Sequence, residues 1–208
     1  MTIKAVVFDY GKVICLPPAA GVMDELASLA GLPVQDMDTL VWKHRGEYDR
    51  GMITGQAYYR NLLSHGGVFP DDALLERMLQ IDLDSWKRIN PATITLMEDI
   101  KAAGYKLGIL SNMPHDFLAW VRETISVIPL LDAEIFSCEV GSIKPENAIY
   151  EILLHRLDCK AEEVIFFDDI SENVGKAQTL GIRGFLWKDP ETARETLHAW
   201  GVSKKEPT

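Results

Sequence analysis

Short apolar runs alternate with amphipathic segments over most of the chain. The runs that we predict to be strands are residues 5–8, 107–110, 134–136, 164–167 and 184–187. Near the later runs, apolar residues recur three or four positions apart, as Ile149, Ile152 and Leu153 do, which is the spacing of one helix face. Alternation of strands and helices favours βαβ units, so the sequence predicts an α/β fold with a mostly parallel sheet.

Residues 16–90, between the first two predicted strands, follow a different pattern. Their apolar residues recur at helical spacing, and glycines and prolines punctuate them. A structureless loop of that length is implausible in a compact domain. We therefore predict an all-helical cap at residues 16–90, inserted into an α/β core of residues 1–15 and 91–208. Because the insertion leaves the sheet directly after the first strand, we expect it to cover that strand end as a lid.

The negative net charge of the chain limits the classes of partner that we expect it to bind. A formal net charge of −10 argues against nonspecific nucleic-acid binding, which needs a basic surface, but not against a small anionic substrate. No apolar run approaches the roughly 20 residues that cross a membrane, so we expect no membrane partner. The three cysteines, Cys15, Cys138 and Cys159, are widely spaced and odd in number, which favours reduced thiols and a cytoplasmic location.

Carboxylates directly follow two of the predicted strands. Asp9 follows residues 5–8, and Asp168 and Asp169 follow residues 164–167. Ligands of open α/β sheets lie at the carboxyl ends of the strands. Two adjacent acids repel each other by roughly 1–4 kcal/mol at contact distance, and a hard cation such as Mg²⁺ removes that repulsion. The three acids therefore predict one metal site.

Further polar groups stand near the ends of other apolar runs, namely Ser111 with Asn112, and Lys144. A carboxylate, a hydroxyl with an amide, a lysine and a metal-binding acid pair together suit phosphoryl transfer. Asp9 is placed to attack phosphorus and form an aspartyl-phosphate. Ser111, Asn112 and Lys144 would stabilise charge on the phosphate oxygens, and Mg²⁺ would shield the repulsion between carboxylate and phosphate.

With these motifs in chain order, nearly the whole chain resembles the haloacid dehalogenase-like hydrolase superfamily. Within it, the chain is similar to the phosphatases that carry a helical cap after the first strand. Residues 138–189 resemble the phosphatase domain of soluble epoxide hydrolases in particular, and bacterial sugar-phosphate phosphatases are also similar. The resemblance implies a doubly wound sheet in which the first strand lies between the second and the fourth.

The resemblance also implies a role for each motif residue. The catalytic residues are Asp9, as nucleophile, and Lys144. The phosphate-binding residues are Ser111, Asn112 and Lys144. The Mg²⁺ ligands are Asp9, the backbone carbonyl of Gly11, Asp168 and Asp169, with Asp169 the more direct ligand of the acid pair. Asn173 is expected to brace the loop that carries this pair.

One position departs from the family pattern. Most phosphatases of the family have a second aspartate two residues after the nucleophile, as a general acid and base, and here that residue is Gly11. General acid–base catalysis typically contributes 10²- to 10⁴-fold, so its loss should slow turnover and favour good leaving groups. His44, Tyr48, His115 or a metal-polarised water could act instead.

The sequence thus predicts a Mg²⁺-dependent phosphatase of a small phosphorylated metabolite, with a sugar phosphate as one candidate. A metal-independent 2-haloacid dehalogenase is the first alternative, because those enzymes also have Tyr-Gly after the nucleophile, as in Tyr10-Gly11, although the pair Asp168-Asp169 speaks against it. A non-catalytic phosphate sensor is the second. The sequence leaves the substrate and the oligomeric state open.

Aromatic and basic residues gather in one part of the predicted cap. They are Trp42, His44, Arg45, Tyr48 and Arg50. One interpretation is a specificity surface that closes over the substrate. The other is an amphipathic helix with Trp42 in the core of the cap and its charges in water.

Overall fold

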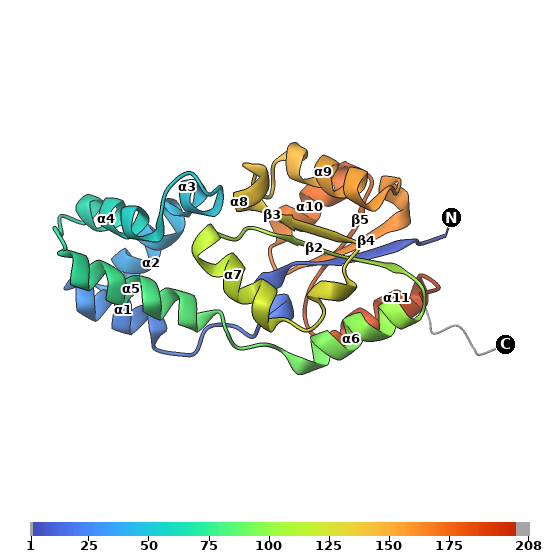
Figure 1. Ribbon diagram of the computed structural model, residues 1–208, viewed down its shortest axis with the longest axis horizontal. Coiled ribbons are helices and arrows are strands. Elements are labelled where there is room, and N and C mark those ends of the chain that lie inside the picture. Colours follow the sequence, from blue (N-terminus) through green and yellow to red (C-terminus); the bar gives the residue numbers. More distant parts are fainter. Residues whose placement is uncertain (1, 203–208) are drawn as a thin grey trace.

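The computed structural model describes residues 2–202, so residue 1 and residues 203–208 of the predicted core lie outside the described part. Its centre is a 5-stranded sheet in the order β3-β2-β1-β4-β5 (Figure 1). The strands are β1 (Ala5–Phe8), β2 (Lys106–Ser111), β3 (Ala133–Phe136), β4 (Val164–Asp168) and β5 (Arg183–Leu186). Every neighbouring pair is parallel, and β1 lies between β2 and β4, which confirms the predicted doubly wound sheet.

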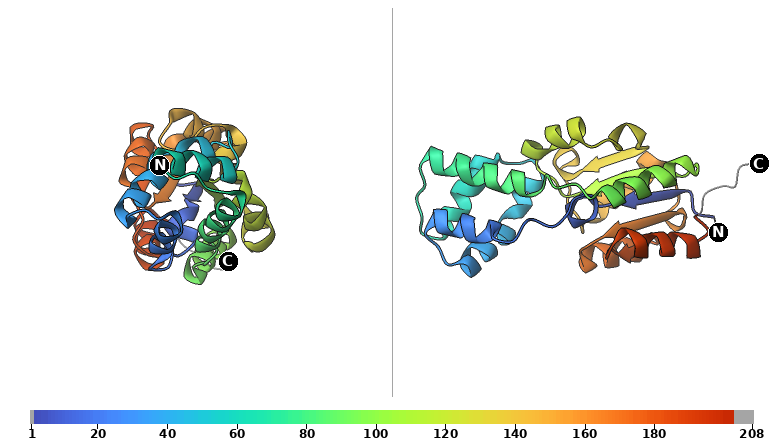
Figure 2. Two further views of the ribbon diagram at one scale, coloured as in Figure 1. Left: turned by 90° about the vertical axis from the view of Figure 1, so that its left-hand side faces the viewer. Right: turned by 90° about the horizontal axis from the view of Figure 1, so that it is seen from below.

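Both faces of the sheet are covered by helices, which explains why its strands read as continuous apolar runs. Along β1, Val6 and Phe8 pack toward one face, and Ala5 and Val7 pack toward the other. The first face is covered by α6 (Pro91–Ala102), α7 (His115–Thr124) and α11 (Pro190–Ala199). The second is covered by α9 (Asn147–Leu157) and α10 (Ser171–Thr179) (Figures 1 and 2).

The stretch between β1 and α6 is helical, as the sequence predicts. Within these described residues the helices are α1 (Val22–Ala30), α2 (Val34–Lys43), α3 (Arg45–Asp49), α4 (Gly55–His65) and α5 (Asp72–Ser85). They enclose a hydrophobic core of their own, in which the fully buried rings of Tyr48 and Tyr58 stack with centroids 4.8 Å apart. We refer to residues 16–90 as the cap.

The cap lies beside the carboxyl edge of the parallel sheet (Figure 1). Its two connections to the core run side by side. Leu16 N donates to Arg88 O at 2.6 Å, and Asn90 N donates to Ile14 O at 2.9 Å. The Asn90 side chain then caps α6, whose first residue is Pro91. The chain therefore leaves and re-enters the core at one place.

The predicted strand positions differ from the structure only at their ends. β5 begins and ends one residue earlier than the predicted run at 184–187, and β2, β3 and β4 are longer than predicted. Strand ends depend on backbone hydrogen bonds, which the apolar pattern does not report. The apolar stripes also gave no sign of α11.

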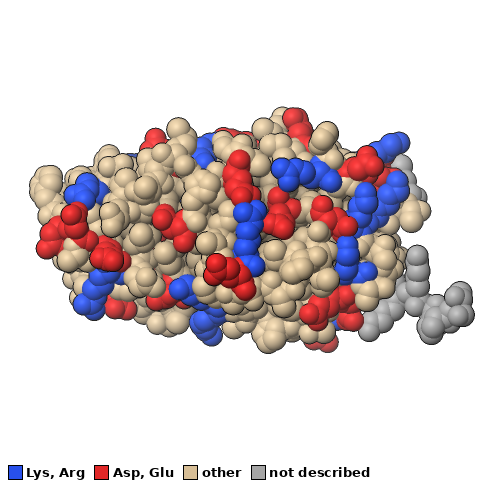
Figure 3. Space-filling model, in the orientation of Figure 1, with Lys and Arg blue, Asp and Glu red and all other residues tan. Residues whose placement is uncertain are grey.

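Three further features concern the surface charges, the cysteines and the length of the helices. On the face shown in Figure 3, acidic and basic side chains are interspersed. All three cysteines are free thiols. Within residues 2–202, no helix is both long and apolar enough to cross a membrane.

Candidate active site

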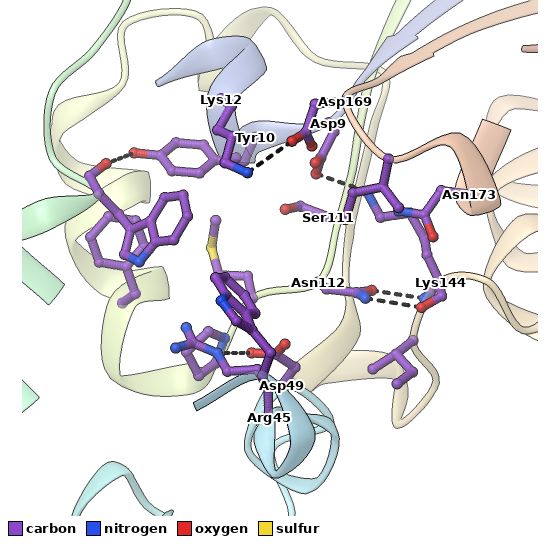
Figure 4. A pocket seen from close by; sticks show the side chains of 18 of the residues that line it. Asp9, Tyr10, Lys12, Arg45, Asp49, Ser111, Asn112, Lys144, Asp169 and Asn173 are labelled. Carbon is purple, nitrogen blue, oxygen red and sulfur yellow. Dashed lines mark hydrogen bonds and ion pairs between the residues drawn. The ribbon is translucent and has the colours of Figure 1, made fainter. Parts of the chain in front are cut away.

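Side chains from four parts of the chain meet at the carboxyl edge of the sheet. Asp9 follows β1, and its backbone N–H donates to Phe167 O at 2.9 Å, which carries the β1–β4 pairing to the strand end. Ser111 ends β2, and Asp168 ends β4. Lys144 arrives from the loop between α8 (Ser137–Val140) and α9. Figure 4 shows Asp9, Ser111 and Lys144 around one cavity, as the sequence predicted from the parallel strand ends.

Lys144 lies at the centre of the charged groups and is almost fully buried. Its Nζ is 2.8 Å from Asp9 Oδ1 and 2.6 Å from Asp168 Oδ2, and it donates to Leu110 O at 2.9 Å. Burial alone would lower the pKa of this ammonium, but the attraction of Asp9 and Asp168 outweighs burial and raises the pKa. Lys144 therefore stays charged and holds the two carboxylates together.

The two acids of the pair have different environments. Asp168 is fully buried, and its oxygens accept hydrogen bonds from Lys144 Nζ, from Ile170 N at 2.8 Å and from Asn173 Nδ2 at 3.1 Å. Asp169 is more exposed than Asp168 and pairs with Lys12 Nζ at 3.2 Å. The side chain of Lys12 is 44% exposed. Asn173 thus braces the acid loop, as expected from the sequence.

The cluster of acids fits a hard divalent cation. Asp9, Asp168 and Asp169 each offer a carboxylate oxygen, and these atoms lie within 4.8 Å of one another. Burial raises the pKa of Asp9 to about 6, and the nearby charges of Asp168 and Asp169 add to this, while Lys144 opposes it. Ionised carboxylates held this close gain from an added cation, and an all-oxygen set is what Mg²⁺ prefers.

Asn112 does something different from what the sequence suggested. Its Oδ1 accepts from Lys144 N at 2.7 Å, and its Nδ2 donates to Lys144 O at 3.0 Å (Figure 4). Both ends of the amide therefore hold the backbone of the lysine loop. The geometry supports a positioning role for Asn112, whereas the buried Ser111 faces the cavity. Phosphate binding by these residues stays a prediction.

The cavity lies between core and cap and has a volume of about 410 Å³. Away from the charged cluster, most of its wall is aromatic or aliphatic. The residues that make this wall include Tyr10, Trp42, Leu83, Trp86, Met113 and Phe117. Trp42 is 51% exposed and faces the cavity, so the interpretation that placed it in the core of the cap is wrong.

Comparison with known proteins identifies the family. The model of the haloacid dehalogenase-like hydrolases matches residues 3–181. The chain belongs to the haloacid dehalogenase-like hydrolases. The hydrolase is 29% identical over 189 residues to a sesquiterpene phosphatase, astK, of Aspergillus oryzae, covering 90% of this chain and 91% of that one. A Pseudomonas (S)-2-haloacid dehalogenase is also among the relatives.

Two further similarities concern the fold and the length. The rat bifunctional epoxide hydrolase 2 is 25% identical over 219 residues, which cover 95% of this hydrolase but only 38% of the rat protein. The Bacteroides thetaiotaomicron enzyme bt-2542, solved in complex with magnesium and inorganic phosphate, superposes with a TM-score of 0.70 at 19% identity. Its structure covers 89% of this chain, and this chain covers 94% of it. At that identity the likeness shows the shared fold.

The residues considered as substitutes for the missing aspartate do not line the cavity of the hydrolase. His44 stacks on His65 with centroids 4.4 Å apart. Tyr48 lies in the core of the cap, and His115 lies against the backbone of Gly51.

The structure instead places in the cavity wall an aspartate that belongs to none of the sequence motifs. Asp49 ends α3 and lines the cavity, and its Oδ1 accepts from Arg45 Nε at 2.9 Å. Arg45 Nη1 also donates to Asp82 Oδ2 at 2.9 Å. Burial raises the pKa of Asp49, although Arg45 opposes the shift. The sequence feature that could have pointed to Asp49 is its position among the aromatic and basic residues of the segment 42–50.

Proposed function

We propose that this hydrolase is a Mg²⁺-dependent phosphatase of a small phosphorylated metabolite. The observation that carries the proposal is the cluster of Asp9, Asp168 and Asp169, of which Asp9 and Asp168 pair with the buried Lys144, while Asp9 and Asp169 line the cavity. A phosphate monoester presents both the anionic oxygens and the electrophilic phosphorus that such a cluster suits. The similarity to the sesquiterpene phosphatase astK and the magnesium and phosphate bound by bt-2542 support the same reaction.

Each residue has a proposed part in the reaction. A carboxylate oxygen of Asp9 attacks phosphorus, the ester bond breaks, and the phosphoryl group rests on Asp9 until water hydrolyses it. Lys144 holds Asp9 in place and, with Ser111, offers hydrogen-bond donors to the phosphate oxygens. Mg²⁺ would be held by Asp9, the Gly11 carbonyl, Asp168 and Asp169, of which Asp169 has the most accessible carboxylate. When bound, it neutralises charge on the phosphate.

The wall of the cavity favours an alcohol that is largely apolar. Trp42, Trp86 and Phe117 present ring surface, whereas Arg45 is already paired with Asp49 and Asp82. A sugar would bring several hydroxyl groups into a wall with few free partners, and each unpaired hydroxyl costs binding energy. The substrate named for astK, a sesquiterpene derivative, is of the apolar kind.

A haloacid dehalogenase reaction is the second candidate, favoured by Tyr10-Gly11 and by the dehalogenase among the relatives. That reaction needs no metal. Without one, the negative charges of three clustered carboxylates would be balanced, among the buried groups of residues 2–202, by Lys144 alone. The charge balance therefore favours the phosphatase.

Hydrolysis of p-nitrophenyl phosphate tests the proposal. We expect turnover with Mg²⁺, loss of turnover with EDTA, and loss in Asp9→Asn with the fold retained by circular dichroism. Turnover of 2-chloropropionate in EDTA would establish the dehalogenase instead. Mg²⁺ binding by a folded protein that turns over neither compound would favour the phosphate sensor.

A further inference from the structure

The phosphatase reaction leaves one proton without a source. When the ester bond breaks, the alcohol oxygen keeps the bonding electron pair and needs a proton. Gly11 has no side chain to supply it. Among the described residues that line the cavity, three have a carboxyl group, namely Asp9, Asp49 and Asp169. Asp9 is the nucleophile and Asp169 belongs to the metal cluster, so Asp49 is the carboxyl group that is left.

Asp49 lies on the side of the cavity where the proton is needed. In-line attack places the leaving oxygen opposite the nucleophile, on the side of phosphorus that faces the cap. Figure 4 shows Asp49 and Arg45 across the cavity from Asp9 and Asp169. The backbone of Asp49 is also fixed to the core, because Ser137 Oγ donates to Asp49 O and accepts from Met113 N at 2.8 Å.

The charges around Asp49 favour a bound proton. Arg45 is one buried cation between two buried carboxylates, Asp49 and Asp82. Asp82 has a second donor, Trp86 Nε1 at 3.1 Å, while Asp49 Oδ1 has only Arg45 Nε. Within residues 2–202, no hydrogen bond reaches Asp49 Oδ2. A proton on this oxygen removes the excess negative charge of the three groups and leaves an O–H free to donate.

We propose that Asp49 is the general acid and base of this hydrolase, supplied by the cap in place of a side chain at Gly11. This inference rests on the proposed phosphatase function. The Asp49 carboxyl group gives its proton to the leaving oxygen as the phosphorus–oxygen bond breaks. The resulting carboxylate then takes a proton from the water that attacks the aspartyl-phosphate, so the acid is restored when inorganic phosphate forms.

Two substrates and two matched variants test the role. Hexyl phosphate releases an alkoxide that must be protonated, whereas p-nitrophenyl phosphate releases a stable phenolate. Asp49→Asn and Glu47→Gln each remove one carboxylate from α3, but Glu47 is exposed, lies outside the Arg45 ion cluster and does not line the cavity. In Asp49→Asn we expect the kcat/KM ratio of hexyl to p-nitrophenyl phosphate to fall about 10²- to 10⁴-fold. In Glu47→Gln the ratio should stay near that of the wild type.

A rescue variant sharpens the result. Gly11 has φ −61°, and a Cβ there would lie 3.7 Å from Trp86 Cζ3 and 3.8 Å from Asp9 Oδ2, which are ordinary contacts. Gly11→Asp combined with Asp49→Asn should therefore restore hexyl phosphate turnover. Equal losses on both substrates in Asp49→Asn would overturn the proposal, because they indicate a structural role.

The proposal can also be tested if Asp49→Asn does not fold. For the wild type with aryl phosphates, an acid predicts a shallow dependence of kcat/KM on the pKa of the leaving phenol, and a steep dependence would overturn the proposal. Failure of the wild type to hydrolyse any of these esters with Mg²⁺ would refute the phosphatase function itself.

Discussion

Lys144 shows how a single buried charge can organise a catalytic cluster. Its side chain is 1% exposed, and it lies within ion-pair distance of Asp9 and Asp168. The sequence predicted that these residues would meet, because Asp9 and Asp168 directly follow two runs that read as buried strands and Lys144 lies in the segment after a third. The direct pairing of Lys144 with Asp168 was not predictable, because it depends on how far the lysine loop reaches across the sheet edge. Asn112 sets that reach through the lysine backbone.

Replacement of Lys144 by methionine should destabilise the protein strongly. The variant leaves two buried carboxylates without their cation, and breaking a buried pair in this way typically costs about 3–5 kcal/mol. We expect a loss of that size in the free energy of unfolding, measured by urea denaturation in EDTA. Adding Asp168→Asn should recover part of the loss, and Lys188→Met, at an exposed position, should stay within about 0.5 kcal/mol of the wild type. A Lys144→Met variant as stable as the wild type would contradict the buried charge cluster.

At the scale of elements, α3 and the segment after it join the cap to the core. Arg50 pairs with Glu146 beside the lysine loop, with Nη1 2.7 Å from Oε2. Gly55 N, at the start of α4, donates to Asp116 Oδ2 at 2.9 Å. Ser137 Oγ donates to the Asp49 carbonyl. These contacts close the cavity over Asp9, and none of them follows from hydrophobic periodicity, because each joins polar groups far apart in the sequence.

The Arg50–Glu146 pair should hold the cap in a pH-dependent way. Hydrogen bonds from Arg50 lower the pKa of Glu146 to about 2, and those from Ser142 and Ile143 add to this. Since the folded pKa lies below the ordinary value of 4.5, the contribution is present above about pH 4.5 and is lost as pH falls toward 2. Glu146→Gln should therefore speed amide hydrogen exchange in α3 at pH 7, with Glu151→Gln, an exposed change on α9, as control. Exchange in α3 that stays at the wild-type rate would argue against this link.

At the scale of the whole molecule, the core was far more predictable than the cap. Its strands are buried on both faces, so apolar runs and the polar residues after them locate both sheet and site. In the cap, some aromatic residues pack in its hydrophobic core and others line the cavity, and the sequence alone does not tell the two kinds apart. Tyr48 and Tyr58 pack inside it, whereas Trp42 and Trp86 face the cavity shared with the core. Asp49 also lines this cavity, and only the position of the cap relative to the core shows that it lies across from Asp9.

This shared cavity makes substrate choice a property of both units together. If its wall holds an apolar alcohol, kcat/KM for linear alkyl phosphates should rise by up to about fourfold per methylene from ethyl to hexyl phosphate, since each buried methylene contributes about 0.8 kcal/mol. Trp42→Ser should flatten this rise, because Trp42 is the exposed aromatic that the cap adds to the cavity. Glucose 6-phosphate, measured beside the series, should be a poorer substrate than hexyl phosphate and respond little to Trp42→Ser. A flat series together with preference for the sugar phosphate would mean that the alcohol binds outside this wall, in contact with solvent rather than with the rings.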